Sequence, residues 1–332
     1  MSVHIKIADF VPDSIQTVGK QTLFVEFSTA STGEALGVPI MLLNGRKKGL
    51  TLVAIAGIHG DEYEGVHALH EIFHRLNADE LSGRFIAVPI ANLAAHRVCS
   101  RESPIDGLNL ARVFPGRRNG SLTERIAHFL SESVIPQADF LIDLHSSGIK
   151  YLMPPLVGYE RSDTDNGRKS QEAAFIFGTP TVWGHPGTPP LGRSVSEAHK
   201  LGIPWLYVES SGGGGLHTDE LRYYTDGLLN LFRFLKMIPG AMDMRPIKFD
   251  LVGNGNIDEA MTTDEVGFFV PMVKPVDFVS PNDVIGVVRD IFGNTISEIK
   301  ANRSGYVVLI RALPVVYPGD TVCVITDGKQ VS

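Results

Sequence analysis

Short apolar runs of about four to eight residues alternate with helical patterns between Leu50 and Phe234. The runs are nearly continuous in apolar character, which is typical of strands that are buried on both faces of a sheet and covered by helices. Gly, Pro, Asn, His or Ser ends each run. We therefore predict an α/β domain with five strands in LTLVAIAG (50–57), RFIAVPIA (84–91), DFLIDLH (139–145), TPTVW (179–183) and IPWLYVE (203–209).

Apolar residues between these runs follow helical spacing. A stripe of such residues predicts an amphipathic helix after the first strand: Val66, Leu69, Phe73 and Leu76. The segment SLTERIAHFL opens with Ser121 and Glu124 at the spacing of a capping box, which predicts a helix start there.

The pattern changes around MIPGAMDMRP (237–246), where Pro239 and Gly240 break the last helix and a β-rich tail follows. We place a domain boundary here, with a catalytic domain at 1–240 and a C-terminal β domain at 241–332. The tail contains a loose internal repeat, because the stretch from Gly267 is similar to the stretch from Gly305. Two related hairpin units predict a small β-rich domain similar to the barrel-sandwich fold of lipoyl-type domains. Lys300 lacks the flanking pattern of a carrier lysine, which favours a structural or gating role for this domain.

Composition narrows the class of protein. The chain has 332 residues and a formal net charge of -7, which argues against a nucleic-acid binder or a protein that binds anionic membranes. The two cysteines, Cys99 and Cys323, are too few for a disulfide framework and favour a reducing compartment. The start MSVHIKIADF has no long apolar region, and no later run approaches the roughly 20 apolar residues of a membrane span. We expect a cytoplasmic protein with a small-molecule substrate, and homo-oligomer formation stays open.

The stretch AIAGIHGDEYEG (54–65) carries polar residues where a buried strand ends. A catalytic zinc site needs three protein ligands and an open fourth position. His59 and Glu62 fit two of these ligands at the carboxyl end of the first strand, and His145 fits the third at the end of DFLIDLH. Asp143 points to the same side of its strand as His145 and is suited to hold the other nitrogen of a ligand histidine.

Two alternatives weaken the metal hypothesis. A His-x-x-Glu pair arises often by chance, with the side chains capping a helix or facing solvent. A rival histidine cluster at helical spacing, His67, His70 and His74, lies opposite the apolar stripe, which favours a solvated helix face.

Four motifs in order, GIHGDEYEG, DGLNLARVFPG, DLHSSG and YVESSGGGG, resemble the succinylglutamate desuccinylase/aspartoacylase family of zinc carboxypeptidase-like hydrolases. The resemblance spans roughly residues 50–235 and extends to the β-rich tail. It implies an α/β/α sandwich with a mixed central sheet, one zinc ion per chain, and His59, Glu62 and His145 as its ligands.

Such a hydrolase needs a carboxylate that takes a proton from the attacking water and passes it to the leaving amine. Glu209 ends an apolar run, so burial is expected to raise its pKa, and the family's catalytic glutamate falls at this motif. The alternative is a strand-end glutamate that is solvated or caps a loop.

Guanidinium groups suit anionic intermediates and carboxylated substrates. By resemblance, Arg101 polarises the scissile carbonyl, and Arg112 and Asn109 bind substrate. A surface or ion-paired arginine is the alternative for each. The residue before Arg112 is Ala111, where the family usually has asparagine. One hydrogen bond to a substrate carboxylate is therefore missing, and we expect hydrolysis with altered substrate recognition.

Other candidates stay open. His185 and Arg193 lie in WGHPGTPPLGRS, which either closes over the site or simply connects two elements. The family's C-terminal tyrosine is either Tyr306 or Tyr317.

Three functions remain. The first is a zinc-dependent deacylase that cleaves the amide bond of a small N-acyl amino acid. The second is a carboxypeptidase that acts on peptide C-termini, against which Ala111 and the extra domain count. The third is a binding protein in which the metal site is structural.

Overall fold

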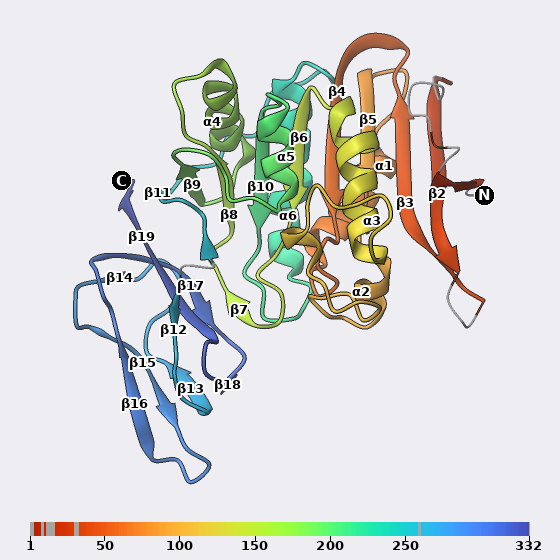
Figure 1. The fold of residues 1–332 in the computed structure, drawn as a ribbon. Helices are drawn as coiled ribbons and strands as arrows, with labels where there is room; N and C mark the ends of the chain where they lie inside the picture. Colours follow the sequence, from red (N-terminus) through yellow and green to blue (C-terminus); the bar gives the residue numbers. More distant parts are fainter. Residues whose placement is uncertain (1–2, 8–9, 11–16, 30–32, 258–259, 332) are drawn as a thin grey trace.

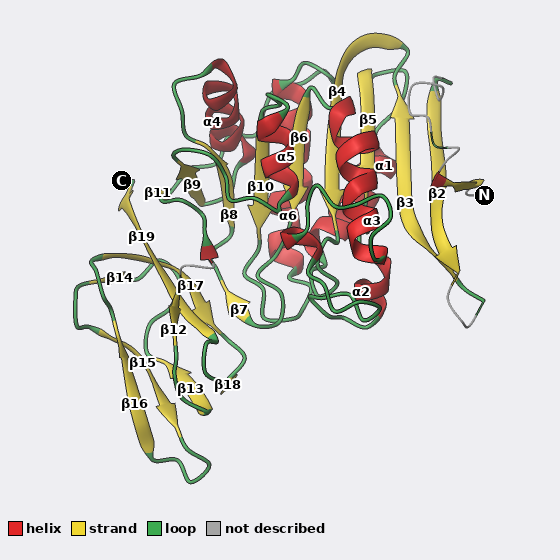
Figure 2. Cartoon of the chain, in the orientation of Figure 1, coloured by secondary structure: helices red, strands yellow, loops and turns green. Residues whose placement is uncertain are grey.

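A computed structural model describes residues 3–7, 10, 17–29, 33–257 and 260–331. Part of the N-terminal stretch MSVHIKIADF lies outside these residues. Figure 2 shows helices packed against one large sheet and a separate strand-rich region at the C-terminal end of the chain. Among the described residues, no helix combines the length and apolar character that crossing a membrane requires.

All five predicted strands are present in the large sheet. They are β4 (Lys47–Ala56), β5 (Ser82–Val88), β6 (Phe140–Leu144), β9 (Thr181–His185) and β10 (Trp205–Glu209). Alternate residues of β4 enter two different cores, with Leu52 and Ala54 on one face and Val53 and Ile55 on the other. Burial on both faces explains why this strand has no polar alternation in the sequence.

The sheet also holds strands that the sequence analysis missed. They are β1 (Val3–Lys6), β2 (Gly19–Thr29), β3 (Ala35–Asn44), β7 (Tyr151–Leu152) and β8 (Leu156–Glu160). β2 and β3 form an antiparallel hairpin at one edge, which leads to the order β1-β2-β3-β5-β4-β6-β10-β8-β9. β4 pairs in parallel with both β5 and β6, and β6 pairs in parallel with β10. The sheet is mixed, because β8 runs antiparallel to β10.

Helices cover both faces of this sheet (Figure 1). Buried residues of α1 (Glu64–Arg75), α4 (Asp165–Phe177) and α6 (Thr218–Phe234) belong to one core. Buried residues of α3 (Leu122–Phe129) and α5 (Ser194–Lys200) belong to the other. Short helices fill the connections: α2 (Leu93–Arg97), η3 (Leu110–Arg112), η4 (Leu130–Val134) and η5 (Ile135–Gln137).

The predicted helix signals agree with these elements. The capping box of Ser121 and Glu124 is present at the start of α3. The apolar stripe of α1 is buried, whereas His67 and His74 are exposed and His70 is half-buried. The three histidines therefore form the outer face of the helix.

The C-terminal part is built from strands, as predicted. They are β11 (Phe249–Val252), β12 (Met261–Thr262), β13 (Gly267–Pro271), β14 (Phe278–Val279), β15 (Val284–Arg289), β16 (Thr295–Lys300), β17 (Gly305–Arg311), β18 (Val315–Val316) and β19 (Thr321–Gln330). A separate four-stranded sheet has the order β16-β15-β13-β18. Lys300 ends β16 and forms an ion pair with Glu298.

The internal repeat corresponds to two similar units, β13-β14-β15 and β17-β18-β19. Each has the same turn before its last strand. Asn282 and Gly319 both have positive φ, and the carboxylates of Asp283 and Asp320 accept backbone N–H bonds from Ser280 and Tyr317. The shared sequence pattern therefore encodes a shared turn geometry.

The two parts of the chain are connected through strands as well as through the backbone. β11 pairs in parallel with β9, and β19 pairs with β11, so the large sheet continues into the C-terminal part. β7 pairs with β17. The domain division at residue 240 stays a prediction.

Candidate active site

The sequence places two of the predicted ligands at the carboxyl end of β4 and the third at the end of β6. His59 and Glu62 lie in the turn between β4 and α1, and His145 directly follows β6. The turn packs so tightly that a Cβ added to Gly60 would lie 2.1 Å from the carbonyl carbon of Ala95. Because β4 and β6 are parallel neighbours, their carboxyl ends meet at one sheet edge.

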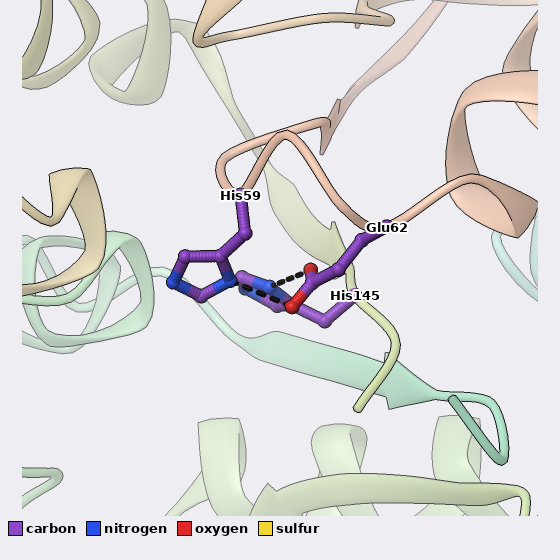
Figure 3. Close-up of side chains that lie close together, drawn as sticks. All are labelled: His59, Glu62 and His145. Atoms are coloured by element: carbon purple, nitrogen blue, oxygen red, sulfur yellow. Dashed lines mark hydrogen bonds and ion pairs between the residues drawn. The ribbon is translucent and has the colours of Figure 1, made fainter. Parts of the chain in front are cut away.

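The three side chains point toward one another (Figure 3). His59 Nδ1 lies 2.7 Å from one oxygen of Glu62, and His145 Nδ1 lies 2.9 Å from the other. His59 and Glu62 are buried, and the side chain of His145 is 12% exposed. Within the described part of the chain, these residues form the group of histidines and carboxylates that could hold a metal ion, with ligand atoms within 4.8 Å of one another.

The charges of this group depend on one another. Burial opposes ionisation of Glu62, but His59 and His145 hold the pKa of its carboxyl below the usual range. Burial would lower the pKa of His145, whereas Asp143 and Glu62 raise it well above the usual value. Burial and the nearby Arg101 lower the pKa of His59. The site thus keeps an ionised Glu62 between two histidine rings.

A second layer of contacts orients the two histidines. Asp143 Oδ2 lies 3.1 Å from His145 Nε2, as the sequence analysis predicts, and it also accepts a hydrogen bond from Ser194 at the start of α5. Asn109 Oδ1 lies 3.1 Å from His59 Nε2 and also accepts a bond from the backbone N–H of Ala111. These contacts leave Nδ1 of each ring directed at Glu62.

Glu209 ends β10, the strand next to β6, and lines the same cavity as His59 and His145. Its Oε2 atom is buried and has no hydrogen-bond partner among the described residues. Burial raises the pKa of Glu209 to about 8, with further contributions from neighbouring charges. A carboxyl group in this state can both accept and return a proton near neutral pH.

The predicted arginines also reach the cavity. Arg101 Nη1 donates to Glu62 across 3.2 Å, and Arg112 Nη1 donates to the carbonyl of Ala111. Both arginines and Ala111 line the cavity. Asn109 contacts His59 and the backbone N–H of Ala111, and its role in binding substrate stays a prediction.

The cavity of about 110 Å³ lies between the catalytic sheet and the C-terminal strands. His185 and Arg193, the two candidates from the connecting loop, both line it. Residues of the C-terminal part complete the wall: Asn254, Gly255, Ile257 and Leu309.

The tyrosines differ from the candidates that the sequence offered. Tyr151 and Tyr207 line the cavity, whereas Tyr306 and Tyr317 are not among its lining residues. Tyr317 is 60% exposed. Tyr207 stands in the motif YVESSGGGG, two residues before Glu209, which was the available signal.

Sequence comparison identifies the catalytic part of the chain. The family profile described as the succinylglutamate desuccinylase/aspartoacylase catalytic domain matches residues 48–235, more than half of the chain. The chain belongs to this family. The candidate zinc ligand His59 and the candidate base Glu209 both lie inside the matched range.

Relatives resemble the chain over nearly its whole length. An N-alpha-acetyl-L-2,4-diaminobutyric acid deacetylase of Halomonas elongata is 29% identical over 322 residues, which cover 96% of this chain and 93% of the relative. The crystal structure of a succinylglutamate desuccinylase from Silicibacter sp. TM1040 is 26% identical, with a TM-score of 0.86 and coverage of 95% and 97%. The product-bound ectoine utilization protein of Ruegeria pomeroyi is 26% identical, with a TM-score of 0.85 and coverage of 94% and 96%. The family's fold therefore includes the C-terminal strands.

Proposed function

We propose that the chain is a zinc-dependent deacylase that hydrolyses the amide bond of a small N-acyl amino acid. One observation carries this proposal: two histidine rings and a carboxylate converge beside Glu209, whose Oε2 atom is buried, in an arginine-lined cavity. The names of the relatives, a deacetylase and a desuccinylase, support the same reaction class.

The donor set fits zinc. Two histidine nitrogens and one carboxylate are the protein ligands of many catalytic zinc sites, and the ion keeps a further position open. His59, Glu62 and His145 would hold the ion, while Asp143 and Asn109 fix the orientation of the two rings. When bound, zinc supplies Lewis acidity toward the acyl carbonyl and lowers the pKa of the attacking water.

The remaining steps belong to the chain's own residues. Glu209 takes the proton of the attacking water and returns it to the leaving nitrogen, for which a raised pKa suits it. Arg101 stands beside the ligand set and stabilises the negative charge that develops on the acyl oxygen. Arg112 and Arg193 line the cavity and offer forked donors to substrate carboxylates.

The shape of the cavity supports a small substrate. Residues of the C-terminal part, including Ile257 and Leu309, complete its wall, which limits access for a peptide chain. The cysteines agree with action in the cytoplasm, because both are free thiols and Cys323 is buried.

A pair of measurements on wild type and Glu209→Gln tests the proposal. Zinc binding is measured by calorimetry, and amine release is measured from N-acetyl, N-succinyl and N-formyl amino acids. We expect the variant to bind one zinc ion as tightly as wild type within about threefold but to lose about 10²–10⁴-fold in turnover. Glu71→Gln, on the exposed side of α1, is the matched control and should retain turnover.

Equal turnover by wild type and Glu209→Gln would remove the proposed role of this residue. A wild-type protein that binds zinc and releases no amine from any member of the panel would contradict the deacylase itself.

A further inference from the structure

The four-stranded sheet of the C-terminal part is packed on one face. The sheet has the order β16-β15-β13-β18. Its inner side chains, among them Phe269, Val288 and Val316, share a core with residues of β17 and β19. Figure 1 shows this sheet at the end of the molecule away from the helices of the catalytic part. Its outer face is exposed along β13.

The run VGFFVPMV (266–273), which contains β13, has no charged or hydrogen-bonding side chain. In the catalytic part, apolar runs of this kind belong to strands that are buried on both faces, as in β4. Here Phe269 is 2% exposed, but the alternate positions are 36–65% exposed: Val266, Phe268, Val270 and Met272. Side chains alternate between the two faces of a strand, so these four form one stripe on the outer face, the β13 stripe. The sequence suits a strand buried on both faces, and the single chain buries only one.

The β13 stripe is part of a wider apolar surface. Val315 of β18 pairs with Phe268 and is 39% exposed. Val287 of β15 pairs with Val270 and is half-buried. Paired residues of neighbouring strands lie on the same face of a sheet. The turn after β15 exposes two more apolar side chains, Ile291 and Phe292. A contiguous apolar surface of this kind is typical of an interaction site.

Opposite charges flank the β13 stripe. Asp264 precedes it and Lys274 follows it, at equal distances along the chain from Phe269, and both are exposed. If a second copy of the stripe lies antiparallel on the first, Asp264 of each copy comes to Lys274 of the other. A parallel arrangement would instead bring like charges together, which is unfavourable. A two-fold axis perpendicular to the strand gives the antiparallel arrangement, and two-fold symmetry is the commonest symmetry of protein oligomers.

The charges on the neighbouring strands follow the same rule. Arg289 of β15 pairs with Phe268. Glu298 of β16 pairs with Val287, which in turn pairs with Val270. Both charged side chains are exposed. In the antiparallel arrangement, Phe268 of one copy lies over Val270 of the other, and as a result Arg289 of one copy comes beside Glu298 of the other. The face therefore complements itself in charge as well as in apolar character.

We propose that a second copy of this chain covers the outer face of the four-stranded sheet, so that the two sheets pack face to face about a two-fold axis. Sheets in such contact interdigitate their side chains and bury both apolar surfaces. A partner with charge of one sign would meet an opposite charge at only one end of the β13 stripe, whereas a second copy satisfies both ends. The contact lies outside the active site and does not depend on the proposed deacylase function.

Sedimentation velocity over a concentration series up to about 100 μM measures the dissociation constant of the dimer. We expect wild type to form a dimer within this range. Phe268→Lys places a charge in the middle of the apolar contact and should raise the dissociation constant at least about 30-fold. Leu201→Lys is the matched control, because Leu201 is 52% exposed but lies in the catalytic part, and it should leave the dissociation constant unchanged. Urea unfolding of both variants checks that they are folded.

Charge exchange tests the antiparallel arrangement. Asp264→Lys and Lys274→Asp each place like charges at both ends of the contact, so each variant alone should dimerise about tenfold more weakly than wild type. Mixed in equal amounts, the two variants should form a heterodimer about as tight as the wild-type dimer, since each charge then meets its opposite. About 1 M salt should remove most of the difference between the variants and wild type, because exposed charges are screened.

A wild-type protein that stays monomeric over the whole series would overturn the inference and leave the face to a different partner. A dimer that Phe268→Lys leaves intact would place the contact between copies elsewhere on the chain. A mixture of the two charge variants that associates no better than either one alone would contradict the antiparallel contact. None of these results changes the expectation for amine release, which tests the deacylase separately.

Discussion

Replacing Glu209 by glutamine should change how the stability of the metal-free protein depends on pH. Burial raises the pKa of Glu209 from its ordinary value of 4.5 to about 8, so the folded protein favours the neutral carboxyl. Below about pH 4.5 the carboxyl is protonated in both the folded and the unfolded state, so its titration does not change the free energy of unfolding. As pH rises from about 4.5 to about 8, the unfolded chain ionises first, and the free energy of unfolding decreases. Above about pH 8 the free energy of unfolding is lowered by the full amount.

The size of this effect follows from the two pKa values. A difference of one pH unit corresponds to about 1.4 kcal/mol, so the upper limit is about 5 kcal/mol. Because the residue retains partial exposure, we expect about 2–3 kcal/mol. Glutamine has similar shape and no charge at any pH. Glu209→Gln should therefore match wild type at pH 4.5 and be more stable by this amount at pH 9.

Urea unfolding in the presence of a chelator measures the difference at both pH values. Taking the difference in the free energy of unfolding between wild type and Glu209→Gln at each pH removes the contribution of the groups that titrate equally in both proteins. Glu71→Gln, which removes an exposed carboxylate of α1, should follow wild type. With saturating zinc the advantage of the variant at pH 9 should shrink, because a nearby cation favours the carboxylate. A constant difference between wild type and Glu209→Gln from pH 4.5 to 9 would refute the reasoning.

Further predictions concern the ligands, the substrate contact and the packing of Gly158 against Tyr207. His59→Ala should lose at least about tenfold in zinc affinity, measured by competition with a chromogenic chelator, because one of three ligands is removed. Ala111→Asn should change KM among N-acyl amino acids with different carboxylates, since it adds a hydrogen-bonding group to the cavity wall; unchanged KM values across the series would dismiss that role. Gly158→Ala should cost about 1–3 kcal/mol in urea unfolding, because its Cβ would meet the ring of Tyr207, whereas Gly215→Ala has open space and should cost less than about 1 kcal/mol.

The elements that carry the site could be predicted because their burial leaves a pattern in the sequence. β4, β6 and β10 are buried on both faces and appear as continuous apolar runs, and the polar residues that end them are the candidates for chemistry. His59 and His145 could be placed together because parallel strands bring their carboxyl ends to one edge.

What the sequence did not reveal depends on contacts between distant segments. β2 alternates between buried and partly exposed residues, so it lacks the continuous apolar run by which we recognised the other strands. β3 is buried along most of its length but lies before the Leu50–Phe234 range in which we predicted strands. The contact of Asn109 with His59 joins residues 50 positions apart. His185 forms a hydrogen bond through Nδ1 with the carbonyl of Gly253, 68 positions away. A local motif carries no trace of such pairs.

The family resemblance alone did not settle which side chains line the cavity. The two C-terminal tyrosines that the sequence offered lie outside its lining, while Tyr151 and Tyr207 are part of it. The C-terminal strands reach the site through residues such as Leu309 on β17, because β7 and β17 pair beside it. The C-terminal strands come close to the active site only through pairing in the folded chain, so a local sequence motif does not indicate it.

The most direct test of the account is amine release by the metal-stripped protein with and without added zinc. N-acyl amino acids serve as substrates, and His59→Ala is measured in parallel with His70→Ala, a half-buried histidine of α1 outside the site. We predict no turnover without metal, recovery on addition of one equivalent of zinc in wild type and His70→Ala, and no recovery at that concentration in His59→Ala. Full turnover by the metal-stripped protein, or zinc-bound protein that hydrolyses none of the substrates, would contradict the account.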